Sequence, residues 1–106
     1  MSDTHTEPDI VVRDNPEHTR YEALIALPDG ARALAGVLVY DDSQAEGART
    51  LLHTVVWEEH SGHGVGGRLA SHAFADARER GVRVVPVCTF VQGWLQRHPE
   101  QADLVA

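Results

Sequence analysis

Four of the six residues at positions 62 to 67 are glycine, in the order Gly-His-Gly-Val-Gly-Gly. Residues 49–57 before this run are expected to form a strand, and apolar residues after it recur at helical spacing. A strand, a glycine-rich turn and a helix bring several backbone N–H groups and a helix N-terminus to one point, which favours an anion. Glycine suits this role because it adopts positive φ and lets the backbone approach a ligand closely. We predict a phosphate-binding turn, and an ordinary tight turn is the alternative.

Two other phosphate-binding motifs do not match this run. A Walker loop ends in Gly-Lys-Ser or Gly-Lys-Thr, and the nine basic residues of this chain are all arginine. A Rossmann dinucleotide site needs its glycines early in the chain, with further strand–helix units and an acidic residue behind them. Too little chain follows Gly67 for such a fold.

The length of 106 residues allows one hydrophobic core, so we expect one domain over residues 9–106. Residues 1–8 are polar and carry no periodic pattern, which predicts a disordered tail. No apolar run approaches the roughly 20 residues of a membrane span, so we expect no membrane partner and a cytoplasmic location. The single cysteine, Cys88, excludes an internal disulfide and a cysteine-rich zinc framework.

The hydrophobic pattern predicts a mixed α/β fold. Four antiparallel strands are expected at residues 10–13, 20–27, 33–40 and 49–57, with Asp29-Gly30 as a hairpin turn. In the last of these we expect Leu51, His53, Val55 and Trp57 to share one face. A helix over residues 64–80, capped by Gly81, then leads to a strand at 82–88, which predicts a β-α-β unit with two parallel strands. A second helix at 90–97 ends before Pro99.

Charge is distributed unevenly along the chain, whose net charge is −7. Residues 1–59 carry 12 acidic and 4 basic residues, whereas residues 60–106 carry 4 acidic and 5 basic ones. The second half can therefore accept a polyanionic ligand, and the first half would attract a cation and repel nucleic acid. The alternative is that these charges only keep the surface solvated.

Several segments resemble the short acetyltransferases of the GNAT superfamily, of the cysteine-and-glycine type. The resemblance is carried by residues 53–69 (HTVVWEEHSGHGVGGRL), Ala77-Arg78, Gly81, residues 84–88 (VVPVC) and residues 97–100 (RHPE). It extends over roughly residues 10 to 105. Ser61 departs from the wider superfamily, which has Gln or Arg at that position, and no tyrosine follows the glycine run.

This resemblance implies a minimal GNAT-like fold, in which antiparallel N-terminal strands precede two parallel strands that splay apart around coenzyme A. It also implies acetyl-CoA as the donor and an N-acetyltransferase activity. On this basis we expect CoA or acetyl-CoA to contact Val55, Val56, Gly62, His63, Gly64, Val65, Gly66, Gly67 and Arg68. Arg78 or Arg83 is a further candidate for its phosphates.

Two residues are candidates for the chemistry of acyl transfer. His53 precedes the glycine run on the same strand, and histidine exchanges protons near neutrality, so we predict a general base. Cys88 follows the second parallel strand, where related proteins place a cysteine near the thioester. It can act as nucleophile, as acid or as inert packing, and we favour direct transfer because a thioester is already activated. For His53 the alternative is an ordinary strand histidine.

The sequence therefore predicts acetyl transfer to a primary amine of a small cationic molecule or of a lysine-bearing peptide, by a monomer or weak homodimer. A CoA-binding module without turnover is the first alternative. A metal site is the second, because His60 and His63 lie three apart beside Glu58 and Glu59, with Cys88 as a further candidate ligand. No strong ligand spacing is present, and we expect no metal.

Overall fold

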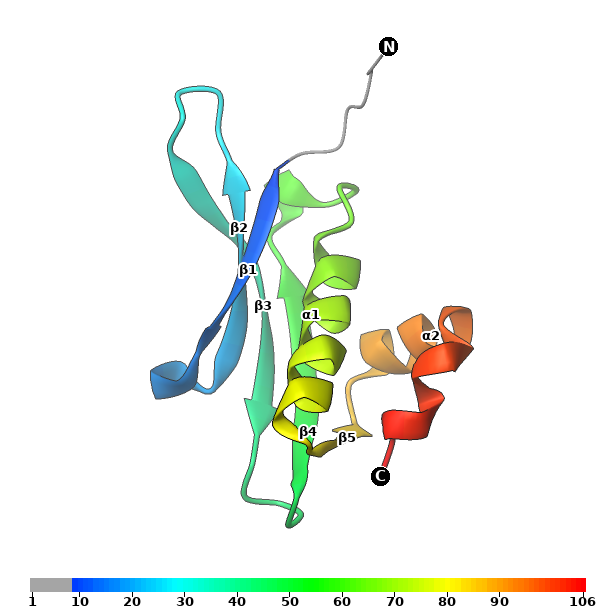
Figure 1. Ribbon diagram of the computed structural model, residues 1–106. Coiled ribbons are helices and arrows are strands. Elements are labelled where there is room, and N and C mark those ends of the chain that lie inside the picture. The colour runs from blue at the N-terminus through cyan, green and yellow to red at the C-terminus, as the bar shows by residue number, and fades with distance from the viewer. Residues whose placement is uncertain (1–8) are drawn as a thin grey trace.

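The computed structural model describes residues 9–106, so the tail predicted for residues 1–8 lies outside the described part of the chain. Five strands form one mixed sheet in the order β1-β2-β3-β4-β5 (Figure 1). Their bounds are β1 (Ile10–Asn15), β2 (Arg20–Ala26), β3 (Arg32–Asp41), β4 (Ala48–Val56) and β5 (Arg83–Pro86). Two α-helices, α1 (Val65–Arg80) and α2 (Thr89–Arg97), accompany the 3-10 helices η1 (Pro16–His18), η2 (Glu58–His60) and η3 (Pro99–Leu104).

The strand connections agree with the sequence prediction. Strands β1 to β4 pair antiparallel in chain order, and β4 pairs parallel with β5 after the α1 crossover. Gly81 ends α1 in a left-handed conformation with φ of 72°, as its predicted role as cap requires. Strand β5 is shorter than predicted because ladder pairing stops at Pro86, which has no N–H to donate. The predicted mixed α/β fold is confirmed.

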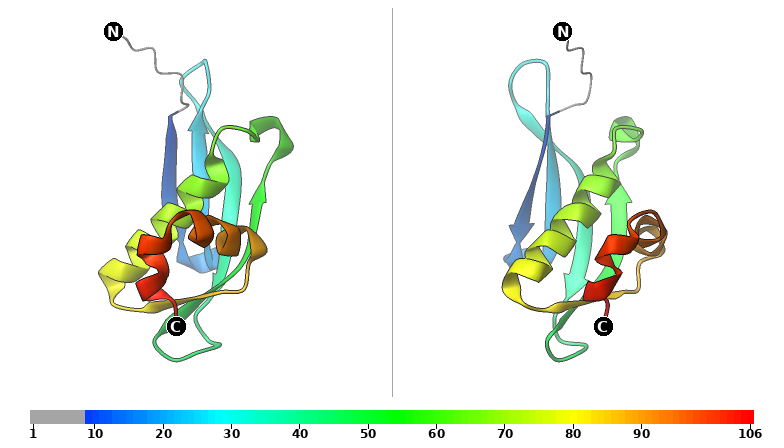
Figure 2. Two further views of the ribbon diagram at one scale, coloured as in Figure 1. Left: turned by 90° about the vertical axis from the view of Figure 1, so that its right-hand side faces the viewer. Right: turned by 45° about the vertical axis from the view of Figure 1, so that its right-hand side comes forward.

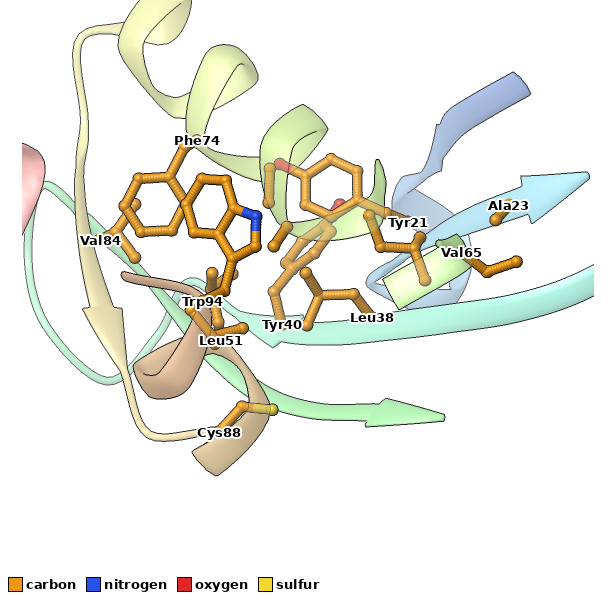
Figure 3. Packing of buried hydrophobic residues seen from close by; sticks show 14 of the residues in the cluster. Tyr21, Ala23, Leu38, Tyr40, Leu51, Val65, Phe74, Val84, Cys88 and Trp94 are labelled. Carbon is orange, nitrogen blue, oxygen red and sulfur yellow. The ribbon is translucent and has the colours of Figure 1, made fainter. Parts of the chain in front are cut away.

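Both helices lie on the same side of the sheet (Figure 2). Helix α1 packs across the strands, and α2 packs beside it, with the rings of Phe74 and Trp94 5.1 Å apart. The buried core lies between this helical layer and the sheet, and its largest side chains include Tyr21, Leu38 and Leu51 (Figure 3). Among residues 9–106, no α-helix lies over the opposite face of the sheet (Figure 2).

A β-bulge in β4 corrects one prediction about this strand. The pairing runs Tyr40↔Leu51 and then Val39↔His53, so Leu52 is an extra residue without a partner of its own on β3. An extra residue reverses the alternation of faces, so Leu51 is 1% exposed in the core while Val55 is 49% exposed. The expectation that Leu51, His53 and Val55 share one face is therefore wrong.

A polar cluster stabilises the end of the sheet that lies away from the glycine run. The guanidinium of Arg49 is buried over the ring of Tyr40, 3.7 Å from its centroid, and pairs with Asp42 at 2.7 Å. Tyr21 donates to Asp76 at 2.8 Å, and burial together with this hydrogen bond raises the pKa of Tyr21 well above its ordinary value. Tyr40 likewise donates to Asp14 at 2.6 Å, so the hydroxyl protons of both tyrosines are held by carboxylates at this end of the sheet.

Within residues 9–106, no helix combines the length and the apolar character needed to cross a membrane. The expected cytoplasmic location stays a prediction.

Candidate functional site

The two parallel strands stop pairing close to Cys88. The last paired residues are Leu51 and Pro86, after which the N–H groups of Val87 and Cys88 both donate to the Leu51 carbonyl, at 3.1 and 2.9 Å. Beyond that point α2 begins, and the remaining half of β4 pairs with β3 alone within the described residues. The strands therefore separate close to Cys88, and the resemblance implied a separation of this kind.

This separation leaves one edge of β4 open. Trp57 donates its N–H to the Ala35 carbonyl at 2.9 Å. This bond shows which residues of β4 direct their backbone N–H and C=O groups toward β3. Backbone N–H and C=O groups alternate in direction along a strand. Those of Thr54 and Val56 therefore point away from β3, toward the open edge of β4. An extended ligand can therefore hydrogen-bond to β4 as a neighbouring strand would.

The glycine run forms the entry into α1 next to this open edge. Gly62 and Gly64 adopt left-handed conformations, with φ of 82° and 81°. The first intrahelical bond joins the Arg68 N–H to the Gly64 carbonyl at 3.0 Å, so the N–H groups of Val65, Gly66 and Gly67 have no intrahelical acceptor. The first turn of α1 contains no acidic residue. These free N–H groups and the helix dipole suit a bound anion.

Two hollows adjoin the N-terminus of α1. The first has a volume of about 410 Å³ and lies between the end of β4, α1 and α2; its lining residues are Val56, Ser61, Gly62, Gly64, Val65, Gly66, Gly67, Phe90 and Arg97. The second, of about 440 Å³, lies between α1 and the C-terminal segment and includes His63 and Arg68. The structure thus gathers most of the predicted cofactor-binding residues at these hollows. The exception is Val55, whose side chain points to the opposite face of the sheet.

Phe90 is a residue of the first hollow that the sequence analysis did not single out. A Cβ added to Gly66 would lie 2.7 Å from Cζ of Phe90, closer than real side chains approach. Gly66 therefore lets the Phe90 ring of α2 lie against α1, and its φ is not positive. The conformational argument applies to Gly62 and Gly64, where an added Cβ would meet nothing within 4 Å.

Cys88 contacts β4 across the point where the strands separate (Figure 3). Its Sγ lies 3.2 Å from Oγ1 of Thr54, and the thiol-bearing residue is 6% exposed at the N-cap of α2. Thr54 was not a candidate in the sequence, because it lies 34 positions from Cys88 and only the fold joins them. The hydroxyl and the thiol form a small polar pair beside the open edge of β4.

His53 does not contact Cys88. Since successive strand residues point to opposite faces, His53 points away from the face where its neighbour Thr54 meets Cys88. Its side chain is exposed on the face of the sheet that no helix covers. The two predicted catalytic residues therefore lie on opposite sides of the sheet, His53 on the face without an α-helix and Cys88 on the helical side.

The arginines near α1 differ in their surroundings. Arg68 donates to the Ile10 carbonyl at 2.8 Å, which holds it beside the second hollow. Arg78 pairs with Asp103 at 3.0 Å, and Arg83 donates to the carbonyls of Asp103 and Val105. Arg78 and Arg83 thus bind the C-terminal segment at the far end of α1, which leaves them badly placed for phosphates at its N-terminus.

The described residues contain no group of three or more histidine, cysteine or acidic side chains arranged to hold a metal ion.

Comparisons with known proteins were made for sequence and for structure. A family model described as GCN5-related N-acetyl-transferase matches residues 20–104. The NMR solution structure of a GCN5-like protein from Staphylococcus aureus superposes with a TM-score of 0.64 at 20% identity, over 91% of this chain and 87% of that chain. The crystal structure of nourseothricin acetyltransferase gives a TM-score of 0.48 at 24% identity, over 76% of this chain and 59% of that chain. No curated protein matches the sequence.

The family match covers most of the chain, and the similarity to the Staphylococcus aureus structure supports the same fold. Both findings agree with the resemblance carried by the glycine run and by the residues around Cys88. The chain belongs to the GCN5-related N-acetyl-transferase family.

Proposed function

We propose that residues 9–106 form an acetyl-CoA-dependent N-acyltransferase domain that moves an acetyl group directly to a primary amine. One observation carries the proposal: the open edge of β4 and the free N–H groups of α1 border the same hollow. An extended arm that ends in a phosphate fits this combination, because one part offers strand-like hydrogen bonds and the other an anion site.

The residues present fit CoA as the donor. The N–H groups of Val65, Gly66 and Gly67 would hold its pyrophosphate, in place of the contact that a Gln or Arg at the position of Ser61 would make. The backbone groups of Thr54 and Val56 would bind the amides of its pantetheine arm. The thioester of this donor supplies an already activated acetyl group. Thr54 and Cys88 would lie at the thioester end, since Thr54 is farther along β4 from the glycine run than Val56 and Cys88 contacts Thr54.

Direct transfer is favoured by the placement of His53 and Cys88. With the donor on the helical side, an acceptor amine can approach from the uncovered face of the sheet, where His53 is exposed. His53 would take the proton that the amine loses as its nitrogen bonds to the acetyl carbon, and the Thr54–Cys88 pair would hydrogen-bond the sulfur of CoA, which leaves as the thiolate when the C–S bond breaks. Much of the rate would come from holding the two reactants together.

The acceptor is proposed to be a small cationic amine or a lysine-bearing peptide. The excess of acidic residues at positions 1–59 overstates the negative charge available to a cationic acceptor. Asp14, Glu22 and Asp42 already pair with arginines. Glu58 and Glu59 are exposed in η2 and form no ion pair within the described residues. They offer negative charge close to the glycine run, where it can attract a cationic acceptor.

A screen of amines and basic peptides with acetyl-CoA tests the activity, with release of the CoA thiol as the readout. Turnover on primary amines is expected, with Gly64→Val as a control that should bind no CoA. Turnover only on hydroxyl or carboxylate acceptors would contradict the proposed acceptor. CoA binding without any turnover would favour the module without activity, and stabilisation by zinc instead of CoA would favour a metal-binding protein.

Intact-protein mass spectrometry tests direct transfer separately. After incubation with acetyl-CoA and no amine, the wild-type chain is expected to keep its mass, as is Cys88→Ala. An adduct of one acetyl group on the wild type alone, lost when amine is added, would show that Cys88 is a nucleophile. The predicted monomer or weak homodimer is tested by light scattering across a concentration series.

A further inference from the structure

Arg97, at the end of α2, differs from every other arginine in the chain. All nine arginines lie within residues 9–106, and the other eight each donate to a carboxylate or a carbonyl oxygen. Arg97 forms no hydrogen bond or ion pair with any described side chain or carbonyl, and its side chain is exposed. A cation without a partner, held on a helix next to a phosphate-binding turn, is available for an anionic ligand.

Arg97 also lies where the two hollows meet. It lines the first hollow, beside β4, together with Val56 and Phe90. It lines the second hollow, between α1 and η3, together with Arg68 and His98. Gly64 and Gly67 are likewise common to both. A ligand whose phosphates rest on the turn can therefore extend into both hollows, past Arg97.

The shape of CoA assigns one end to each hollow. Its pantetheine arm and its 3′-phosphorylated adenosine leave the pyrophosphate in opposite directions. The open edge of β4 adjoins the first hollow and suits the arm, so the adenosine end is left with the second.

We propose that the second hollow binds the 3′-phosphoadenosine end of CoA, with Arg97 paired to the 3′-phosphate. This inference rests on the proposed function, because it takes CoA as the donor. Arg97 therefore distinguishes CoA from donors that lack the 3′-phosphate.

The other groups of the second hollow agree with an anionic, aromatic ligand. Arg68 is held there by its hydrogen bond to the Ile10 carbonyl. Glu100 is the one acidic residue among the lining residues, against Arg68 and Arg97, so the lining carries a net positive formal charge. The ring of His98 stacks on Trp94 at 4.3 Å, and its Nδ1 lies 2.9 Å from the Trp94 carbonyl. Because a carbonyl oxygen only accepts hydrogen bonds, Nδ1 of His98 carries a proton and donates it to this bond. Nε2 is the polar atom of the ring that is left to contact a ligand.

Calorimetry with CoA and with 3′-dephospho-CoA tests the assignment on the folded chain. The wild type is expected to bind CoA about tenfold more tightly, the worth of one charge-assisted pair. Arg97→Gln should bind both ligands equally and keep the affinity of the wild type for 3′-dephospho-CoA. Arg32→Gln is the matched control, because Arg32 is exposed on β3 and pairs with Asp9 at 2.8 Å, and it should keep the tenfold preference.

Three results would overturn the assignment, and they have different meanings. Equal binding of both ligands by the wild type would show that no group reads the 3′-phosphate. An equal loss of affinity for both ligands in Arg97→Gln would place Arg97 on the pyrophosphate. In either case CoA still binds, so the proposed function survives. Binding of neither ligand by the wild type would overturn the proposed function as well.

Discussion

The Thr54 hydroxyl and the Cys88 thiol lie 3.2 Å apart, at the point where β4 and β5 separate. Either atom can donate, so the pair can present a hydrogen to a neighbouring acceptor while one partner holds the other in place. The contact joins two residues that are 34 positions apart in the sequence. It lies on the helical side of the sheet, next to the open edge of β4.

Thr54→Val is expected to lower turnover about fivefold, because a hydrogen bond of roughly 1 kcal/mol to the thiol is lost while the shape of the side chain is kept. Thr54→Ser, which keeps the hydroxyl, should stay within about twofold of the wild type. The measurement is CoA release at saturating acetyl-CoA and amine. In a Cys88→Ala background the effect of Thr54→Val should vanish. A fivefold loss in that background too would mean that Thr54 acts independently of Cys88.

His53→Ala is expected to lower turnover most at low pH, where few acceptor amines are free of their proton and assistance by a base matters most. The loss should be on the order of 100-fold near pH 6 and should shrink toward pH 9. Steady-state rates across this range check it, and calorimetry should give an unchanged CoA affinity because His53 lies on the opposite face from Thr54. A loss that is the same at every pH would argue against a role as base.

Gly64→Ala is expected to weaken CoA binding at least tenfold. Gly64 lines both hollows, and an added Cβ there would meet no protein atom within 4 Å, so it would take up space next to the expected ligand. A non-glycine residue at φ of 81° also costs about 1 kcal/mol of conformational strain. Gly30→Ala is the matched control, since Gly30 has φ of 88° in the β2–β3 hairpin and open space around it. Both variants should lose similar stability in thermal melts, but only the first should lose CoA affinity. Equal CoA affinity in the two variants would contradict a ligand at Gly64.

Glu22 should make the stability of the chain depend on pH in acid. Its side chain is 4% exposed; burial raises its pKa, but hydrogen bonds from Asn15, Arg20 and Arg13 outweigh burial and lower the pKa from 4.5 to about 2. A lowered pKa stabilises the fold above pH 4.5, and this contribution is lost as the pH falls through 2. The lowering of the Glu22 pKa corresponds to a contribution of roughly 3 kcal/mol to the free energy of unfolding at neutral pH.

Glu22→Gln tests this dependence by urea unfolding at several pH values. The variant should be less stable than the wild type at pH 7, and the difference should shrink steadily between pH 4.5 and 2. A difference that is constant over this interval would mean that the charge of Glu22 contributes nothing and that the loss is one of packing.

Much of the fold could be predicted because its signals are local. Alternating residues mark the strands, Asp29-Gly30 marks a hairpin, and Gly81 and Pro99 mark helix ends. The glycine run is equally local, so the N-terminus of α1 was predicted with its neighbouring strand.

The remaining features depend on long-range relationships that leave no local signal. Residues 48–57 contain no glycine or proline that would mark a bulge, so nothing in that segment shows which residue is unpaired on β3. The Thr54–Cys88 pair depends on where β5 ends. That Arg97 alone has no described partner becomes visible only when the fold shows the partners of the other eight arginines. The packing of Phe90 on Gly66 requires two helices to be in place. Sequence reasoning therefore predicted the glycine run and the strand before it, but it did not reveal these contacts, and the location of the site stays a prediction.

The bulge at Leu52 makes the length of β4 matter more than its composition. Before the bulge the strand contributes Leu51 to the core, and after it the strand contributes Thr54 to the helical side and His53 to the open side. Deleting or inserting one residue between Leu51 and His53 would exchange these two sides, leaving every amino acid present but turning the imidazole inward and the hydroxyl outward. Among natural variants of this chain, substitutions in this segment should therefore be tolerated more often than changes in the number of its residues.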